Sequence, residues 1–148
     1  VDVNDRALRN VIVGLGETEK EMVDRIQWAH DLGIAVGLFA FTPVRGTPLA
    51  DRPPPALASY RRVQAARWLI VHDLVRAGEI VFDDAGQIIS LEGRLPEGGE
   101  PFETSGCPDC NRPFYNEQPG GPLYNYPRSL TADEAARAIE EMEIEFTC

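Results

Sequence analysis

The apolar positions of the first 41 residues fall into two short runs on either side of an amphipathic segment. Residues 10–14 (NVIVG) form an apolar run that ends at a glycine, which is typical of a buried strand. Thr18 and Glu21 have the spacing of a capping box, and apolar residues then recur at helical intervals as far as Gly33. Residues 34–41 (IAVGLFAF) are apolar throughout, which favours a parallel strand covered on both faces. Together these elements predict a βαβ unit.

The pattern beyond this unit is less regular. Residues 42–55 are proline-rich and predict a loop, and a long helix is expected over 57–77, closed by Gly78. Two short apolar runs at 80–82 and 88–89 flank the turn sequence DDAG and predict a hairpin.

The last third of the chain combines a long loop with one more helix. Residues 95–128 show little periodicity, and a loop of that length is expected to be functional or held by something. Thr131 and Glu134 form a second capping box, which predicts a final helix to about Met142. The acidic run over 140–145 is expected to be the solvated end of this helix.

These elements predict an α/β fold with a single main core, because 148 residues that are 43% hydrophobic suffice for one ordinary domain. We divide the chain into residues 1–78, which hold the β/α units, and residues 79–148. The second part is an irregular extension with the hairpin, a cysteine-containing loop and the last helix.

The charge of the chain excludes some classes of partner. A formal net charge of −10 works against binding to the phosphate backbone of nucleic acid or to an anionic membrane surface. No apolar run approaches the roughly 20 residues of a spanning helix, and no signal peptide is visible. Three cysteines do not fit a paired secreted framework, so we expect a cytoplasmic protein. Since the chain opens at Val1 without a methionine, we also expect it to be a piece of a longer protein.

Two glycines lie between the first strand and the first helix. Gly14 and Gly16 would let a ligand approach the backbone, and exposed N–H groups at a helix start favour an anionic or polar ligand. The same residues also fit a tight turn with a good cap and no ligand. The chemistry of the residues leaves both interpretations open.

A resemblance favours the first interpretation. Residues 12–18 (IVGLGET), followed by Gly46-Thr47-Pro48-Leu49, resemble the later barrel strands of biotin synthase and its radical S-adenosylmethionine relatives. Ile12, Gly14 and Glu17 match the family pattern Gly-x-Ile-x-Gly-x-x-Glu, with Asn10 in place of the first glycine. The resemblance covers residues 10–78. It implies the C-terminal portion of a partial (β/α) TIM-type barrel. The residues that it assigns to adenosylmethionine binding are Ile12, Gly14, Gly16, Glu17, Phe41 and Pro43.

The chain departs from the family in two respects. The Cys-x-x-x-Cys-x-x-Cys motif that binds the catalytic 4Fe–4S cluster is absent, and in the family it lies N-terminal to the part that this chain resembles. The missing N-terminal half of the barrel is therefore an expected partner, and the chain alone is not expected to cleave adenosylmethionine. Leu8 and Arg9 occupy the position of a biotin synthase cysteine that binds a second cluster, so a 2Fe–2S centre of that type is not expected.

Cys107 and Cys110 form a Cys-x-x-Cys pair within the irregular loop, and Cys148 is the third cysteine. Thiolates at this spacing can bind one metal centre, either a zinc ion or an auxiliary 4Fe–4S cluster with one position left for another ligand. A redox dithiol and unligated thiols are the other interpretations. His30 and His72 fall within predicted helices, without a partner at ligand spacing, and are read as ordinary helix residues.

The segment 104–128 is also similar to the tail of biotin-synthase-like radical proteins, including the two-subunit lipoyl synthases. This similarity implies sulfur insertion into an unactivated C–H bond, with adenosylmethionine and 4Fe–4S clusters as cofactors. It implies a small-molecule substrate or an acyl chain on a lipoyl domain, and a possible second radical subunit. A non-enzymatic zinc-binding α/β module is the alternative function.

Six further residues of this tail have two interpretations each. The aromatic residues either cover a cluster or, as we favour, pack the loop against the barrel, and the arginines either meet a carboxylate or, as we favour, lie on solvated surface. The aromatic residues are Phe114, Tyr115, Tyr124 and Tyr126, and the arginines are Arg112 and Arg128.

Overall fold

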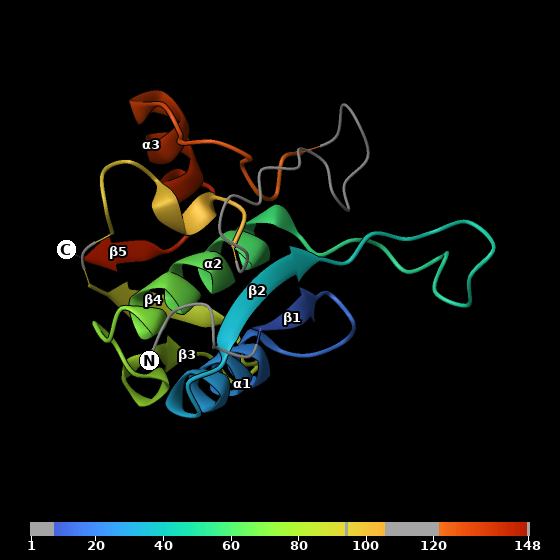
Figure 1. Cartoon of the computed structure of the whole chain (residues 1–148), viewed down its shortest axis with the longest axis horizontal. Helices are drawn as coiled ribbons and strands as arrows, with labels where there is room; N and C mark the ends of the chain where they lie inside the picture. Colours follow the sequence, from blue (N-terminus) through green and yellow to red (C-terminus); the bar gives the residue numbers. More distant parts are fainter. Residues whose placement is uncertain (1–7, 94, 106–121, 148) are drawn as a thin grey trace.

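The computed structural model describes residues 8–93, 95–105 and 122–147 of the chain. In this part of the chain, three α-helices and two small sheets form a mixed α/β domain (Figure 1). The described residues do not form a closed barrel. None of the described helices is both long and apolar enough to cross a membrane.

The N-terminal part is the predicted βαβ unit. Strand β1 (Leu8–Val13) pairs in parallel with β2 (Ala35–Ala40), and helix α1 (Glu19–Asp31) connects them. Both predicted ends of α1 are confirmed. Thr18 and Glu21 form the capping box, and Gly33 has a φ of +73° directly after the C-cap.

Helix α2 (Leu57–Val71) is six residues shorter than the sequence predicted, so the expected end at Gly78 is wrong. The chain leaves the helix at Asp73, whose φ is +56°. The N–H of Asp73 donates to Ile70 O (3.0 Å) and the N–H of Leu74 donates to Leu69 O (2.9 Å), which is the hydrogen-bond pattern of a Schellman motif. An aspartate therefore fills the left-handed position that was assigned to a glycine, and residues 77–79 (η2, Ala77–Glu79) form a separate 3₁₀ turn.

The second sheet belongs to the C-terminal part. Strands β3 (Val81–Phe82) and β4 (Ile88–Glu92) form the predicted antiparallel hairpin, and β5 (Glu145–Thr147) adds in parallel to β4. A 3₁₀ turn, η3 (Glu100–Phe102), and helix α3 (Ala132–Glu140) lie between β4 and β5.

The expectation for the acidic run after α3 is only partly correct. Glu140 and Glu143 are exposed, but Met142 between them is fully buried. Residues from Glu145 onward form β5 rather than the end of a helix.

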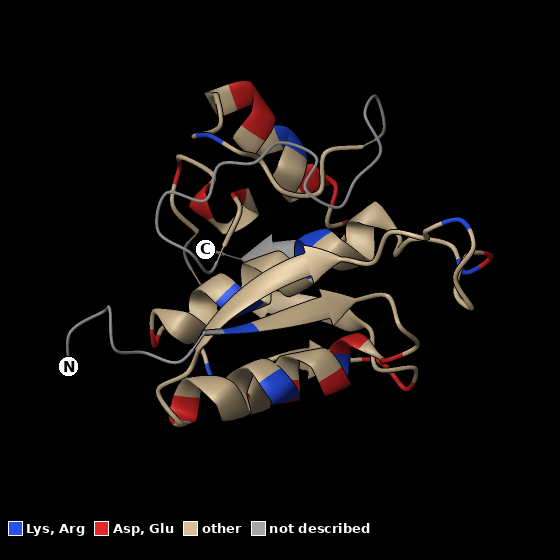
Figure 2. Cartoon of the chain, turned by 45° about the vertical axis from the view of Figure 1, so that its right-hand side comes forward, with Lys and Arg blue, Asp and Glu red and all other residues tan. Residues whose placement is uncertain are grey.

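One hydrophobic core includes residues from both sides of position 78. Helix α1 contacts both α2 and β2, and α2 also contacts η3. In Figures 1 and 2, α1 and α3 lie at opposite ends of the molecule, with α2 and the first sheet between them. The fully buried side chains include Ile26, Leu69, Ile88, Leu91, Phe102 and Met142. The extension is therefore packed onto the βαβ unit and α2.

Candidate functional site

The turn between β1 and α1 is filled by a side chain of the protein itself. Gly14 and Gly16 have φ angles of +107° and +109°, which favour glycine. The N–H of Gly14 donates to Glu17 Oε1 (2.7 Å), and the N–H of Leu15 donates to Glu17 Oε2 (2.9 Å). The N–H groups of Gly14 and Leu15, which the sequence analysis offered to a ligand, therefore already donate to the carboxylate of Glu17 in this structure.

The two glycines of the turn have different surroundings. A Cβ added to Gly14 would lie 2.9 Å from Pro55 Cδ and 3.3 Å from Phe41 Cβ. Gly14 is therefore needed for the proline segment before α2 to pack on the end of β1. A Cβ on Gly16 would meet only the guanidinium of Arg52, at 3.6 Å or more. A side chain added at Gly16 would therefore begin with ordinary van der Waals contact.

Gly16 lines a cavity of about 340 Å³ at the carboxyl end of β1, which we call the strand-end cavity. Its volume is near the lower end of the range for small-molecule sites. Arg52 brings a positive charge to it, with Nη1 3.5 Å from Gly14 O. The lining residues are Val13, Gly14, Gly16, Glu17, Arg52, Pro53, Pro54, Pro55, Ala56 and Ser59.

A second hollow, of about 440 Å³, runs along the outer edge of β1 and against α1. Ile12 and Leu15 line it, and both are more than two-fifths exposed. Glu17 lines this hollow as well as the strand-end cavity. The structure therefore separates Ile12 from the two glycines with which the sequence grouped it.

The remaining residues assigned to adenosylmethionine, Phe41 and Pro43, lie just after the end of β2. Phe41 is half-buried, its N–H donates to Val13 O (2.8 Å), and it contacts the Gly14 side of the turn. Pro43 is also half-buried. Neither side chain lines the strand-end cavity.

The three cysteines lie outside the described residues, as do Arg112, Phe114 and Tyr115. The residues that flank the segment 106–121 are described and lie close together. The N–H of Thr104 donates to Tyr126 O and the N–H of Tyr126 donates to Phe102 O, both at 2.9 Å. The hydroxyl of Tyr124 donates to Pro55 O (2.7 Å), so the residues after this segment reach the wall of the strand-end cavity.

Both described tyrosines of the tail are buried, as expected for aromatic residues that pack the loop. Tyr124 also meets Tyr60 edge-on, with ring centroids 5.3 Å apart. Arg128 is exposed and forms two hydrogen bonds of 2.8 Å to the carboxylate of Glu134. Arg128 therefore pairs with a carboxylate within the chain.

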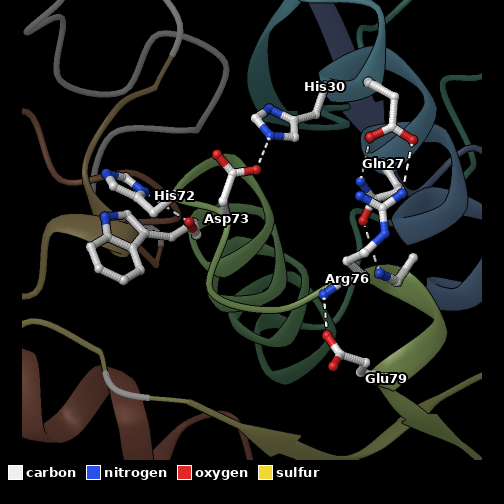
Figure 3. Close-up of polar contacts among 9 residues, drawn as sticks. Gln27, His30, His72, Asp73, Arg76 and Glu79 are labelled. Atoms are coloured by element: carbon white, nitrogen blue, oxygen red, sulfur yellow. Dashed lines mark hydrogen bonds and ion pairs between the residues drawn. The ribbon is translucent and has the colours of Figure 1, made fainter.

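The two histidines lie at the C-terminal ends of α1 and α2 and make separate contacts (Figure 3). His30 Nε2 is 2.8 Å from Asp73 Oδ1, whereas His72 Nδ1 is 2.8 Å from Trp68 O and its ring stacks on Trp68. No cluster of three or more possible metal ligands occurs among the described residues. The described histidines therefore fit their interpretation as ordinary helix residues.

Sequence reasoning missed the side of the strand-end cavity that residues 52–56 and Ser59 line. Arg52 and Pro55 reach the Gly14 turn only because the arm formed by residues 42–55 leaves β2 and returns to α2 (Figure 1, right). Their proline-rich surroundings predicted a loop but not where the loop returns.

The described residues form a mixed α/β domain with a cavity of about 340 Å³ at the carboxyl end of β1. Comparison with known proteins gave no match to a family model, a curated protein or a solved structure.

Proposed function

We propose that this chain is the C-terminal part of a radical S-adenosylmethionine enzyme that inserts sulfur into an unactivated C–H bond, in a reaction of the lipoyl or biotin type. The observation that carries the proposal is the strand-end cavity beside Gly16. It lies at the carboxyl end of β1, one strand of a parallel pair, and α/β proteins bind ligands at this end of their strands. Gly14 and Glu17 of the radical family pattern line it, and Ile12 of the same pattern lies on β1 just before the turn.

The residues of the cavity fit S-adenosylmethionine. Gly16 leaves room for a ligand close to the backbone, and Arg52 supplies a cation for its carboxylate. Pro55 forms the wall, and Ser59 offers a hydroxyl. When bound next to a reduced 4Fe–4S cluster, adenosylmethionine supplies a 5′-deoxyadenosyl radical that abstracts hydrogen from carbon, while the protein orients it and excludes water.

The two edges of the first sheet support its assignment to a partial barrel. Backbone groups on the outer edge of β2 already have side-chain partners, since Arg67 Nε donates to Val36 O (2.8 Å) and the N–H of Leu38 donates to Ser105 Oγ (2.9 Å). On β1, Val13 faces β2 because its carbonyl accepts from Phe41. Ile12 therefore points its backbone groups to the other edge, where no described strand pairs with it. In this proposal the N-terminal part of the barrel pairs there.

The proposal also gives the cysteine pair a role. Cys107 and Cys110, with Cys148, are its candidate ligands for an auxiliary 4Fe–4S cluster that serves as the sulfur source. The hydrogen bond between Tyr124 and Pro55 supports this role, because it joins the residues after the cysteine segment to the cavity wall. The substrate is an unactivated acyl chain, either free or carried on a lipoyl domain, and a second radical subunit is a possible partner.

The experiment uses the natural protein that contains this chain, reconstituted anaerobically with iron and sulfide. We expect about eight iron atoms per protein, two clusters of four, and release of 5′-deoxyadenosine under strong reductant. Replacing Cys107 and Cys110 together with Ala should lower the iron content to about four while cleavage of adenosylmethionine persists. Stoichiometric zinc without sulfide, and no 5′-deoxyadenosine, would instead support the zinc-binding module.

A further inference from the structure

The arm formed by residues 42–55 projects from the rest of the molecule. It leaves β2 after Ala40 and returns to α2 at Leu57, and between these points it extends away from the helices and sheets (Figures 1 and 2). Residues 44–49 and 51–54 are exposed. A loop of this length that packs on so little of its own domain is typical of a functional segment.

Hydrogen bonds and prolines hold the arm in a defined shape. The N–H of Thr47 donates to Val44 O (3.2 Å), and the hydroxyl of Thr47 donates to the same carbonyl (2.7 Å). The N–H of Arg52 donates to Leu49 O (3.1 Å). The five prolines of the arm each fix a φ angle. The arm therefore needs little further ordering when a partner binds it.

The exposed surface of the arm combines apolar and cationic side chains. Val44 is 58% exposed and Leu49 is 45% exposed. Arg45 and Arg52 are exposed as well, and neither forms an ion pair with a carboxylate of the described residues. Arginine next to exposed apolar side chains is a composition that favours protein–protein contact.

The distribution of charge along the chain favours an acidic partner at the arm. Residues 41–72 contain five arginines and a single acidic residue, Asp51, whereas the whole chain has 24 acidic and 14 basic residues. Of these five arginines only Arg45 and Arg52 are exposed, and both lie on the arm. An acidic protein is repelled by the net charge of the chain and attracted at the arm, which orients it there.

The arm also adjoins the strand-end cavity. Arg52 and residues 53–55 line this cavity, and Arg52 Nη1 lies 3.5 Å from Gly14 O. A protein domain that binds the arm is therefore held next to the cavity.

We propose that the arm is the docking surface for an acidic carrier domain that brings an acyl chain to the strand-end cavity. Arg45 and Arg52 meet carboxylates of this domain, and Val44 and Leu49 pack against its apolar side chains. The inference deepens the proposed function and rests on it for the identity of the carrier as a lipoyl domain. Its own physical content is that the charge and the apolar side chains of the arm determine the binding.

The test measures the affinity of the natural protein for an octanoylated lipoyl domain of negative net charge. Isothermal titration calorimetry is carried out at two salt concentrations and without reductant, so that binding is measured apart from radical chemistry. Arg45→Glu is compared with Arg137→Glu, which makes the same change of charge at an exposed arginine on α3, away from the arm (Figure 1).

We expect Arg45→Glu to weaken binding at least about tenfold and to reduce its dependence on salt, because a like charge then faces the carboxylates of the domain. Arg137→Glu should change the affinity by less than about twofold, since charges farther apart than the Debye length are screened. Equal losses in the two variants, or no binding of the domain by the unmodified protein, would overturn the inference.

A second variant tests the apolar part of the surface. Val44→Ser together with Leu49→Ser should weaken binding by about tenfold while the dependence on salt stays the same, because only apolar burial is lost. Both side chains are exposed, so this variant should fold, and its circular dichroism spectrum checks that it does. An affinity unchanged by these two substitutions would count against the inference.

Two further outcomes separate this inference from its alternatives. If Arg45→Glu changed the oligomeric state of the protein but not its affinity for the domain, a second copy of the chain would occupy the arm and the inference would be wrong. Release of 5′-deoxyadenosine under strong reductant is measured separately. Its absence would contradict the proposed function, while the binding comparison would still decide the role of the arm.

Discussion

Arg62 and Glu19 form a buried ion pair in which Arg62 Nη2 lies 2.6 Å from Glu19 Oε1 and Nε lies 3.1 Å from both carboxylate oxygens. The pair also accepts and donates backbone hydrogen bonds. The N–H of Ile88 donates to Glu19 Oε2 (2.7 Å), and Arg62 Nη1 donates to Met142 O (2.8 Å). One pair thus connects α1, α2, β4 and the residues after α3.

Replacing Arg62 with Met should destabilise the fold by about 3–5 kcal/mol, because it leaves the carboxylate of Glu19 buried without its cation. The free energy of unfolding is measured by urea titration. Lys20→Met is the matched control, since the Lys20–Asp24 pair is more than half exposed. We expect that control to change stability by less than about 1 kcal/mol. If both variants lost a similar amount of unfolding free energy, the buried Arg62–Glu19 pair would contribute no more to stability than the exposed Lys20–Asp24 pair.

The Arg128–Glu134 pair predicts a specific dependence of stability on pH. The hydrogen bonds from Arg128, together with the backbone N–H of Thr131, lower the pKa of Glu134 from 4.5 to about 2. A depressed carboxyl pKa contributes stability above the unfolded value, and that contribution is lost as the pH falls from about 4.5 to about 2. The thermal midpoint of Glu134→Gln should therefore fall less than that of the unmodified protein over this range. Parallel curves for the two proteins would refute the assignment.

The left-handed residue at the end of α2 can be tested with two substitutions. Asp73→Ala and Asp73→Gly both lose the contact with His30, so their difference isolates the cost of a φ of +56°. The glycine variant should be more stable by about 1 kcal/mol, because a Cβ disfavours this conformation. Urea unfolding gives the comparison. If the alanine variant were as stable as the glycine variant, residue 73 would not keep its positive φ in the alanine variant.

Gly14 and Gly16 should differ in their effect on stability. Alanine at either position is strained by the positive φ, but only at Gly14 would the added Cβ lie 2.9 Å from Pro55. Gly14→Ala should therefore be less stable than Gly16→Ala by about 1–3 kcal/mol, the usual cost of overpacking. The measurement is the unfolding free energy of both variants. If both variants lost the same unfolding free energy, the positive φ angles alone would explain why glycine is needed at both positions.

Local signals in the sequence predicted the local structure. Both capping boxes formed as expected, at Thr18 with Glu21 and at Thr131 with Glu134, because each joins residues only three positions apart. Gly33 ended α1 for the same reason. The Gly14–Glu17 turn was likewise located by its composition.

Long-range contacts could not be predicted in this way. The end of α2 depends on Asp73, which pairs with His30 more than forty residues away. Arg61 and Arg62 are adjacent in sequence and both buried, yet they bind different parts of the chain. No periodicity distinguishes such arginines from solvated ones, and the return of Arg52 to the Gly14 turn leaves no local signal either.

The central claim is that the strand-end cavity beside Gly16 binds S-adenosylmethionine, and equilibrium binding tests it most directly. The natural protein, anaerobically reconstituted, is compared with Gly16→Val and with Gly33→Val, whose glycine also has a positive φ but lies at the other end of α1. We expect Gly16→Val to weaken binding at least about tenfold, or about 1.4 kcal/mol, because its side chain enters the cavity. Gly33→Val should bind as the unmodified protein does. Equal affinity in all three proteins would contradict the account and leave Gly16 as a residue of the turn only.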